Sequence, residues 1–147
     1  MNYLSLLAFL SGVAIATQAS MNAQLGSLLK SPLLAASVAF SSSVFFTLCA
    51  VLVCTKNYPS LDSIKAVPTF LWFSGGVLSA FGISIFYYLI PKMGIASMMS
   101  FALSGQLVFA VLAGHFAWFG LGVRPISLSH VAGVMAMVVG ISLINKG

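Results

Sequence analysis

Two amide side chains, Gln18 and Asn22, lie four residues apart in a stretch whose other members are small or apolar. On a helix this spacing places both side chains on one face. Moving an amide into an apolar medium without a hydrogen-bond partner costs roughly 2 to 7 kcal/mol, so such a group either joins helices or contacts a solute. Gln24 points roughly 200° away from Asn22 around the helix. We expect Gln24 at the membrane exit, outside the pair.

Further polar residues occur near membrane depth in the later segments. The candidates for a solute pathway are Gln18, Asn22, Ser84, Tyr87, Ser100, Ser104 and Gln106. Their hydroxyl and amide groups can both donate and accept hydrogen bonds. Gln106 is the second amide site at this depth, so we expect it to be the partner of the first helix. Two structural alternatives stand, because tyrosines near a helix end ordinarily anchor at the interface and serine hydroxyls often bond back to a carbonyl one turn earlier. The serine run from Ser41 to Ser43 is expected to bond back in this way.

The sequence argues against an enzyme. No apolar segment pairs a serine or cysteine with a base and a carboxylate, and no zinc-ligand or phosphate-loop spacing occurs. We therefore predict no catalytic residues, no metal and no cofactor. Cys49 and Cys54 are expected to be small apolar residues, because their spacing matches no metal or redox motif. Proton coupling would have to use His115 or His130, and His115 is more typical of a membrane boundary.

The elements that carry these residues are five long apolar runs. The composition is 61% hydrophobic and 5% charged, against about 25% charged in a soluble domain. About 20 apolar residues cross a bilayer core of about 30 Å, and an open sheet edge cannot face lipid. The sequence predicts one all-α transmembrane domain over residues 1–147, with helices at about 3–24, 33–55, 69–90, 95–113 and 126–144. No Lys or Arg precedes the first run, so we expect an uncleaved span rather than a signal peptide.

Small residues at three- and four-residue spacing predict where helices pack closely. They are Gly12 and Ala16 in the first run, Gly75, Ser79 and Gly82 in the third, and Ala132, Ala136 and Gly140 in the fifth.

The distribution of positive charges does not predict a single orientation of the chain in the membrane. With five spans, one side of the membrane carries Lys56, Lys65 and Arg124, and the other carries Lys30, Lys92 and Lys146. Because Lys and Arg in short loops set topology, this balance predicts insertion in both directions and an antiparallel, ten-helix homodimer. The alternative is a fixed orientation helped by a partner. The scattered lysines indicate membrane flanks rather than a nucleic-acid surface.

Several local patterns occur in a fixed order along the chain. They are the Gln18 to Asn22 spacing followed by Leu25, Gly26 and Pro32, the run Pro91, Lys92, Met93 and Gly94, the pair Gly105 and Gln106, and a closing helix with Gly133 and Gly140. Together they resemble the YdcZ-like family of small inner-membrane proteins, within the drug/metabolite transporter superfamily. The resemblance implies half of a ten-helix transporter in the bacterial cytoplasmic membrane, and Gln18, Asn22 and Gln106 match the family pattern. Gly114 stands where that pattern has an acidic residue, so no role of that acid carries over.

Two functions follow as hypotheses. The first is a transporter that works as an antiparallel homodimer in the lipid bilayer and moves a neutral, zwitterionic or amphipathic small solute. The predicted spans contain no Asp, Glu, Lys or Arg, whereas cation and proton transporters typically hold a carboxylate or a histidine within the membrane as a relay. The second is a non-transporting accessory or structural subunit, with a heteromeric assembly as one form, in which every buried amide is satisfied between helices.

Overall fold

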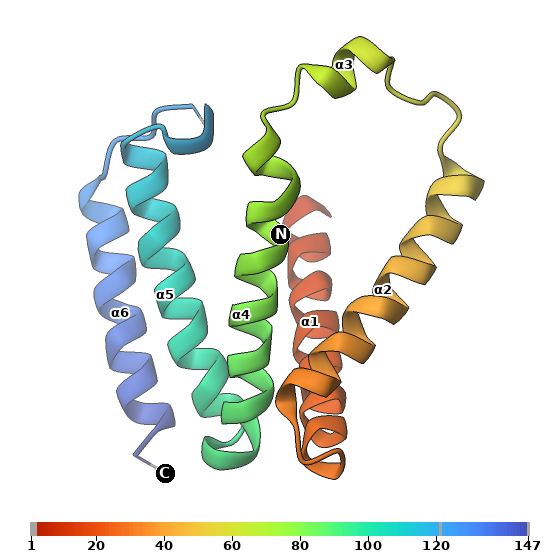
Figure 1. Ribbon diagram of the computed structural model, residues 1–147. Helices are drawn as coiled ribbons and strands as arrows, with labels where there is room; N and C mark the ends of the chain where they lie inside the picture. Colours follow the sequence, from red (N-terminus) through yellow and green to blue (C-terminus); the bar gives the residue numbers. More distant parts are fainter. Residues whose placement is uncertain (1–2, 121, 147) are drawn as a thin grey trace. The chain divides into compact units, whose positions relative to one another are not determined.

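The computed structural model describes residues 3–120 and 122–146, which are helical apart from short connections (Figure 1). The helices are α1 (Tyr3–Leu28), α2 (Pro32–Cys54), α3 (Leu61–Lys65), α4 (Thr69–Met93), α5 (Ile95–His115), the 3-10 turn η1 (Trp118–Gly120) and α6 (Leu128–Ile144). Four of them, α1, α2, α4 and α5, are long and apolar enough to cross a membrane, and α6 is a shorter apolar helix of 17 residues. The predicted all-α membrane protein of about five helices is confirmed. That all five form one domain stays a prediction.

The helix ends differ from the predicted ones by up to four residues. Helix α1 continues past Gln24 to Leu28, α4 continues past Ile90 to Met93, and α6 begins at Leu128. The third helix was predicted to end at about residue 90, before Pro91, but Pro91 lies inside α4. Proline has no N–H and therefore cannot donate to the carbonyl four residues earlier, which here belongs to Tyr87. So close to the end of the helix, this loss affects few backbone bonds.

The chain divides into two compact units, one ending at Lys92 and the other beginning at Met93. In the first unit, α1 and α2 pack against each other around their tight connection. The Ser31 side chain accepts a hydrogen bond from the Leu34 N–H and so caps α2, whose first residue is Pro32. Lys30 adopts a left-handed conformation with φ of 53°, and the Ser31 N–H then reaches the Gly26 carbonyl over 2.9 Å. This is a Schellman-type helix ending.

The close approach of α1 and α2 depends on small side chains. A Cβ added to Gly26 would lie 3.3 Å from the Cα of Pro32 and 3.4 Å from the Cβ of Ala35. The neighbouring contact surface is made of four buried alanines, Ala19, Ala23, Ala35 and Ala36. Beyond this contact every residue of α2 from Ser41 to Cys54 is exposed, and Figure 1 shows this part of the helix leaning away from α1.

The second unit is a hairpin of α5 and α6. The Arg124 N–H donates to the Gly114 carbonyl over 2.8 Å, which closes the connection. Ser127 caps α6, and Ser127 and His130 form a reciprocal capping box. The turn between the helices is aromatic, because Phe116 and Trp118 stack at 5.7 Å between ring centroids. His115, Phe116 and Trp118 thus form an aromatic cluster at one end of the hairpin.

Candidate functional site

Three side chains of the first unit form a closed triangle of hydrogen bonds. The Asn22 amide nitrogen donates to the Gln18 amide oxygen over 2.8 Å and to the Tyr87 hydroxyl over 3.0 Å. The Tyr87 hydroxyl in turn donates to the same Gln18 oxygen over 3.3 Å. We call these three residues the amide–tyrosine triad. It satisfies polar groups at membrane depth and joins α1 to α4.

The triad exists because two helical spacings meet. Gln18 and Asn22 are one turn apart on α1, so both side chains face the same direction. Tyr87 comes from α4 and is only 2% exposed, whereas its neighbour Tyr88 is 49% exposed. The Lys92 ammonium donates to the Tyr88 hydroxyl and lies 3.8 Å from the centre of its ring. Tyr88 and Lys92 have the form of an interfacial anchor, while Tyr87 points inward.

The triad lines a cavity of about 410 Å³ in the first unit. The other lining residues are Ile15, Ala39, Phe40, Ser42, Ser43 and Ile83. Polar groups of α1, α2 and α4 therefore converge on a space with apolar walls, which is the usual composition of a small-molecule site. No charged side chain lines this cavity.

Ser42 and Ser43 were missed as site residues because serine in a membrane helix commonly bonds back to its own backbone. Ser42 does so, with its hydroxyl 2.9 Å from the Ala39 carbonyl oxygen, but the hydroxyl oxygen can still accept. Ser43 makes no side-chain hydrogen bond within the part of the chain that the structure describes. The signal in the sequence was the occurrence of three consecutive serines in an apolar segment.

Ser84, three residues before Tyr87 on α4, does not line the cavity of the triad. It lines a second cavity, of about 340 Å³, together with Leu33, Ala80, Phe81, Ile85 and Tyr88. Its hydroxyl oxygen is fully buried and has no hydrogen-bond partner among the described residues. This distinguishes it from Ser104, whose hydroxyl bonds back to the Ser100 carbonyl over 2.7 Å.

The remaining candidates belong to α5 in the second unit. Ser100 is buried and its hydroxyl donates to the Ser97 carbonyl over 2.8 Å. Gln106 is exposed and makes no side-chain hydrogen bond to the described residues of its own unit. Within the first unit, Tyr87 is the side chain from another helix that bonds to the α1 amides. A role for Gln106 stays a prediction.

The small residues predicted to pack helices behave differently along the chain. In α1 the contact with α2 uses Ala19, Ala23 and Gly26, further along the helix than Gly12 and Ala16. Nothing lies within 4 Å of a Cβ added at any of the four predicted packing glycines, which are Gly12, Gly75, Gly82 and Gly140. Ser79, Ala132 and Ala136 are exposed. These positions are therefore open for contact with another chain, which stays a prediction.

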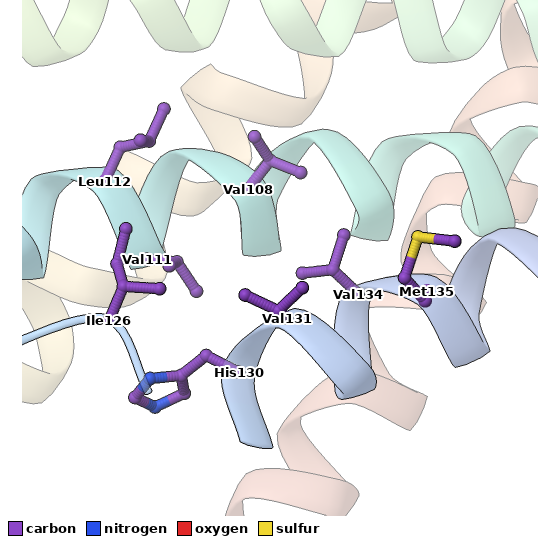
Figure 2. Close-up of a pocket in the computed structure, with 8 residues that line it drawn as sticks. All are labelled: Val108, Val111, Leu112, Ile126, His130, Val131, Val134 and Met135. Carbon is purple, nitrogen blue, oxygen red and sulfur yellow. The ribbon is translucent and has the colours of Figure 1, made fainter. Parts of the chain in front are cut away.

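A smaller cavity of about 190 Å³ lies in the α5–α6 hairpin, and its lining is apolar except for His130 (Figure 2). The eight lining residues are Val108, Val111, Leu112, Ile126, His130, Val131, Val134 and Met135. Nδ1 of His130 accepts a hydrogen bond from the Ser127 N–H over 3.1 Å. Nδ1 of His115 accepts one from the N–H of Ile126, the residue before Ser127, over 3.4 Å. Both histidines thus hold the start of α6. Among the described residues no group of three or more His, Cys, Asp or Glu side chains could hold a metal ion.

Comparison with known proteins adds the family. Residues 3–143 match the family model described as "Putative inner membrane exporter, YdcZ". Comparisons with curated proteins and with solved structures gave no match. The match covers nearly the whole chain, and four of the helices it spans are long and apolar enough to cross a membrane. The chain therefore belongs to the YdcZ family of inner-membrane exporters in the drug/metabolite transporter superfamily, and it is a multi-pass protein of the inner membrane.

Proposed function

We propose that this exporter moves a neutral, zwitterionic or amphipathic small solute, that the amide–tyrosine triad lies on the solute pathway, and that the working unit is an antiparallel homodimer. In this proposal each five-helix chain supplies half of a ten-helix transporter. The single observation that carries the proposal is the cavity of about 410 Å³ in which polar groups of three apolar helices meet.

The chemistry of the cavity supports an uncharged solute. Amides, hydroxyls and apolar side chains line the cavity. Among the described helices other than α3, the only charged residue is Lys92, in the last turn of α4. An ion placed there would lose its hydration without an opposite charge to replace it, which costs far more than transferring a neutral group. A neutral hydrogen-bonding solute exchanges bonds to water for bonds to the site.

The packing supports a second copy of the chain. Within the first unit, α2 from Ser41 to Cys54 and α4 from Thr69 to Phe81 are exposed along their whole length. These stretches include the exposed small residues Gly75 and Ser79, whose lack of bulk suits close contact with another helix. The balanced lysine and arginine count supports the opposed orientation of the two copies.

The pathway is tested in proteoliposomes with Asn22→Leu and, as a second variant, Gln106→Leu. A transport role predicts that protein-dependent flux of the solute falls in Asn22→Leu while the protein remains folded and dimeric. Unchanged flux in Asn22→Leu would contradict a pathway through the triad. Met21→Leu, at an exposed position of the same helix, is the matched control.

The orientation is tested separately by labelling. Cys49 and Cys54 are free and exposed, so both are first replaced by alanine, and Asn57→Cys then supplies a single thiol in the exposed loop after α2. We expect about half of the copies to react with an impermeant reagent added outside, because the charge count is balanced. Labelling from one side only would contradict the antiparallel dimer.

The accessory-subunit alternative also has an observation in its favour. Both hydrogens of the Asn22 amide nitrogen are used inside the chain, as a purely structural residue would use them. That function predicts that Asn22→Leu lowers stability or assembly and that no solute flux depends on the protein.

A further inference from the structure

The hydrogen bonds within the triad leave only some of its polar groups free to bind a solute. The Asn22 amide nitrogen has two hydrogens, and both are donated, one to Gln18 and one to Tyr87. The Gln18 amide oxygen has two lone pairs, and it accepts from both Asn22 and Tyr87. The Tyr87 hydroxyl uses its one hydrogen and accepts one bond. The Asn22 N–H groups, the lone pairs of the Gln18 oxygen and the Tyr87 hydrogen are therefore all used within the triad.

Two groups of the triad have no partner among the described residues. They are the Gln18 amide nitrogen, which carries two N–H donors, and the Asn22 carbonyl oxygen, which offers two lone pairs. Neither atom is among the fully buried atoms without a partner, so both retain accessible surface. Gln18 and Asn22 both line the cavity of about 410 Å³. Their free amide nitrogen and free carbonyl oxygen are therefore the groups of the two amides left to bind a solute there.

We propose that the solute is held through an uncharged planar group that carries an acceptor and a donor side by side, such as a primary or secondary amide, a urea or a lactam. This inference rests on the proposed function and names the substrate class for the same site. The solute carbonyl accepts from the Gln18 amide nitrogen, and the solute N–H donates to the Asn22 carbonyl oxygen. Ser43 of α2 supplies a further hydroxyl at the cavity wall.

The same count disfavours ionic solutes. A cation offers donors only, so it can use the Asn22 carbonyl but leaves the Gln18 N–H groups unpaired, and no carboxylate lines the cavity. A carboxylate offers acceptors only and leaves the Asn22 carbonyl unpaired. A site built to hydrogen-bond a solute discriminates against an analogue that leaves its polar groups without partners.

The apolar walls fit the rest of such a molecule. Ile15, Phe40 and Ile83 contribute aliphatic and aromatic surface to the same cavity. The amide therefore fixes the orientation of the solute, and its hydrocarbon part contacts these side chains. An amide attached to a small aromatic or aliphatic body is the form that this lining accommodates.

The test compares four probes of similar size with one aromatic ring each: benzamide, methyl benzoate, benzoate and benzylammonium. Binding to the full-length protein in nanodiscs is measured by calorimetry, and counterflow of the same probes is measured in proteoliposomes. We expect benzamide to bind about tenfold more tightly than each of the other three, the factor that one net hydrogen bond supplies. This ranking on the unaltered protein needs no variant.

A substitution then reverses the polarity of the site. Gln18→Glu keeps the oxygen that accepts from Asn22 and Tyr87 and replaces the outward N–H donors by a carboxylate oxygen. We expect the preference to move from benzamide to benzylammonium. Gln24→Glu makes the same change on the exposed side of the same helix and is expected to leave the ranking unaltered. If Gln18→Glu does not fold, Gln18→Met removes the outward donor without adding charge. We expect it to weaken benzamide and methyl benzoate by a similar factor, because both carbonyls accept from Gln18, and to weaken benzylammonium less, because the cation uses only the Asn22 carbonyl.

The outcomes separate this inference from the proposed function. Counterflow that depends on Asn22 but ranks benzoate, benzylammonium or methyl benzoate level with benzamide or above it overturns the substrate class and leaves the pathway standing. An absence of protein-dependent binding and counterflow for all four probes overturns both.

Discussion

Asn22 on α1 and Tyr87 on α4 share a hydrogen bond of 3.0 Å although they are 65 residues apart in sequence. The bond makes the tyrosine hydroxyl both an acceptor from Asn22 and a donor to Gln18. One hydroxyl thus supplies the second hydrogen bond of both the Asn22 amide nitrogen and the Gln18 amide oxygen.

Tyr87→Phe removes the hydroxyl and leaves one Asn22 hydrogen and one Gln18 lone pair without a partner. We expect a loss of about 0.6 to 2 kcal/mol in stability, the range for hydrogen bonds between membrane helices. Thermal unfolding in detergent measures it. Tyr88→Phe is the control, because the Tyr88 hydroxyl is exposed and pairs with Lys92 one turn away on the same helix. Equal effects of the two substitutions would show that the triad adds nothing to stability.

Gly26→Val tests the close approach of α1 and α2. A Cβ at this position lies 3.3 Å from a backbone atom of Pro32, which cannot move aside easily, so the larger side chain separates the helices. Overpacking of this kind costs about 1 to 3 kcal/mol. Gly12→Val carries the same change in helix propensity and meets nothing within 4 Å. Equilibrium unfolding of the two variants gives the difference, and a Gly26 variant as stable as the Gly12 variant would contradict the packing.

Ser84→Ala removes a buried hydroxyl that has no partner among the described residues. Because an unsatisfied buried polar group costs about 1 to 3 kcal/mol, the variant is expected to be as stable as the unaltered protein or more stable. If Ser84 also contacts the solute, as the sequence predicts, flux falls while stability rises. Ser104→Ala, which removes a hydroxyl bonded to the Ser100 carbonyl, provides the comparison. A loss of stability on removing Ser84 would mean that its hydroxyl has a partner in the membrane.

Ser127→Ala tests the capping box at the start of α6. The substitution removes the acceptor for the His130 N–H, and loss of such a cap costs about 0.5 to 2 kcal/mol. Hydrogen exchange of the first turn of α6 is expected to quicken. Ser142→Ala should have little effect there, since that hydroxyl only bonds back to the Val138 carbonyl. Unchanged exchange in the first turn would argue against the cap.

Much of the fold could be predicted because a helix needs about 20 apolar residues to cross the bilayer core, so the length of each apolar run indicates whether it can span the membrane. The helix ends were less accessible. Gln24 resembles an exit residue, yet α1 continues to Leu28 because Lys30 and Ser31 complete the turn by backbone hydrogen bonds that the residue types do not signal. Pro91 resembles a helix boundary, but its ring is compatible with the last turns of α4.

The sequence names all three residues of the triad as candidates, but it predicts which of them lie together only within α1. The four-residue spacing of Gln18 and Asn22 predicts that they share a face, and the hydrogen bond between them is in keeping with it. Spacing within a helix contains no information on which other helix lies opposite. Gln106 was the natural choice because it is an amide, whereas Tyr87 resembles an interfacial anchor by its place near a helix end. Only the contact across helices separates Tyr87 from Tyr88.

Pro91 has a consequence for the residue that closes the triad. Since proline has no N–H, the peptide carbonyl of Tyr87 lacks the donor that an ordinary residue one turn later would supply. The Tyr87 side chain is therefore hydrogen-bonded to α1, whereas its main-chain carbonyl makes one hydrogen bond fewer within its own helix. A bend of α4 at this point breaks fewer main-chain hydrogen bonds than a bend in the middle of the helix.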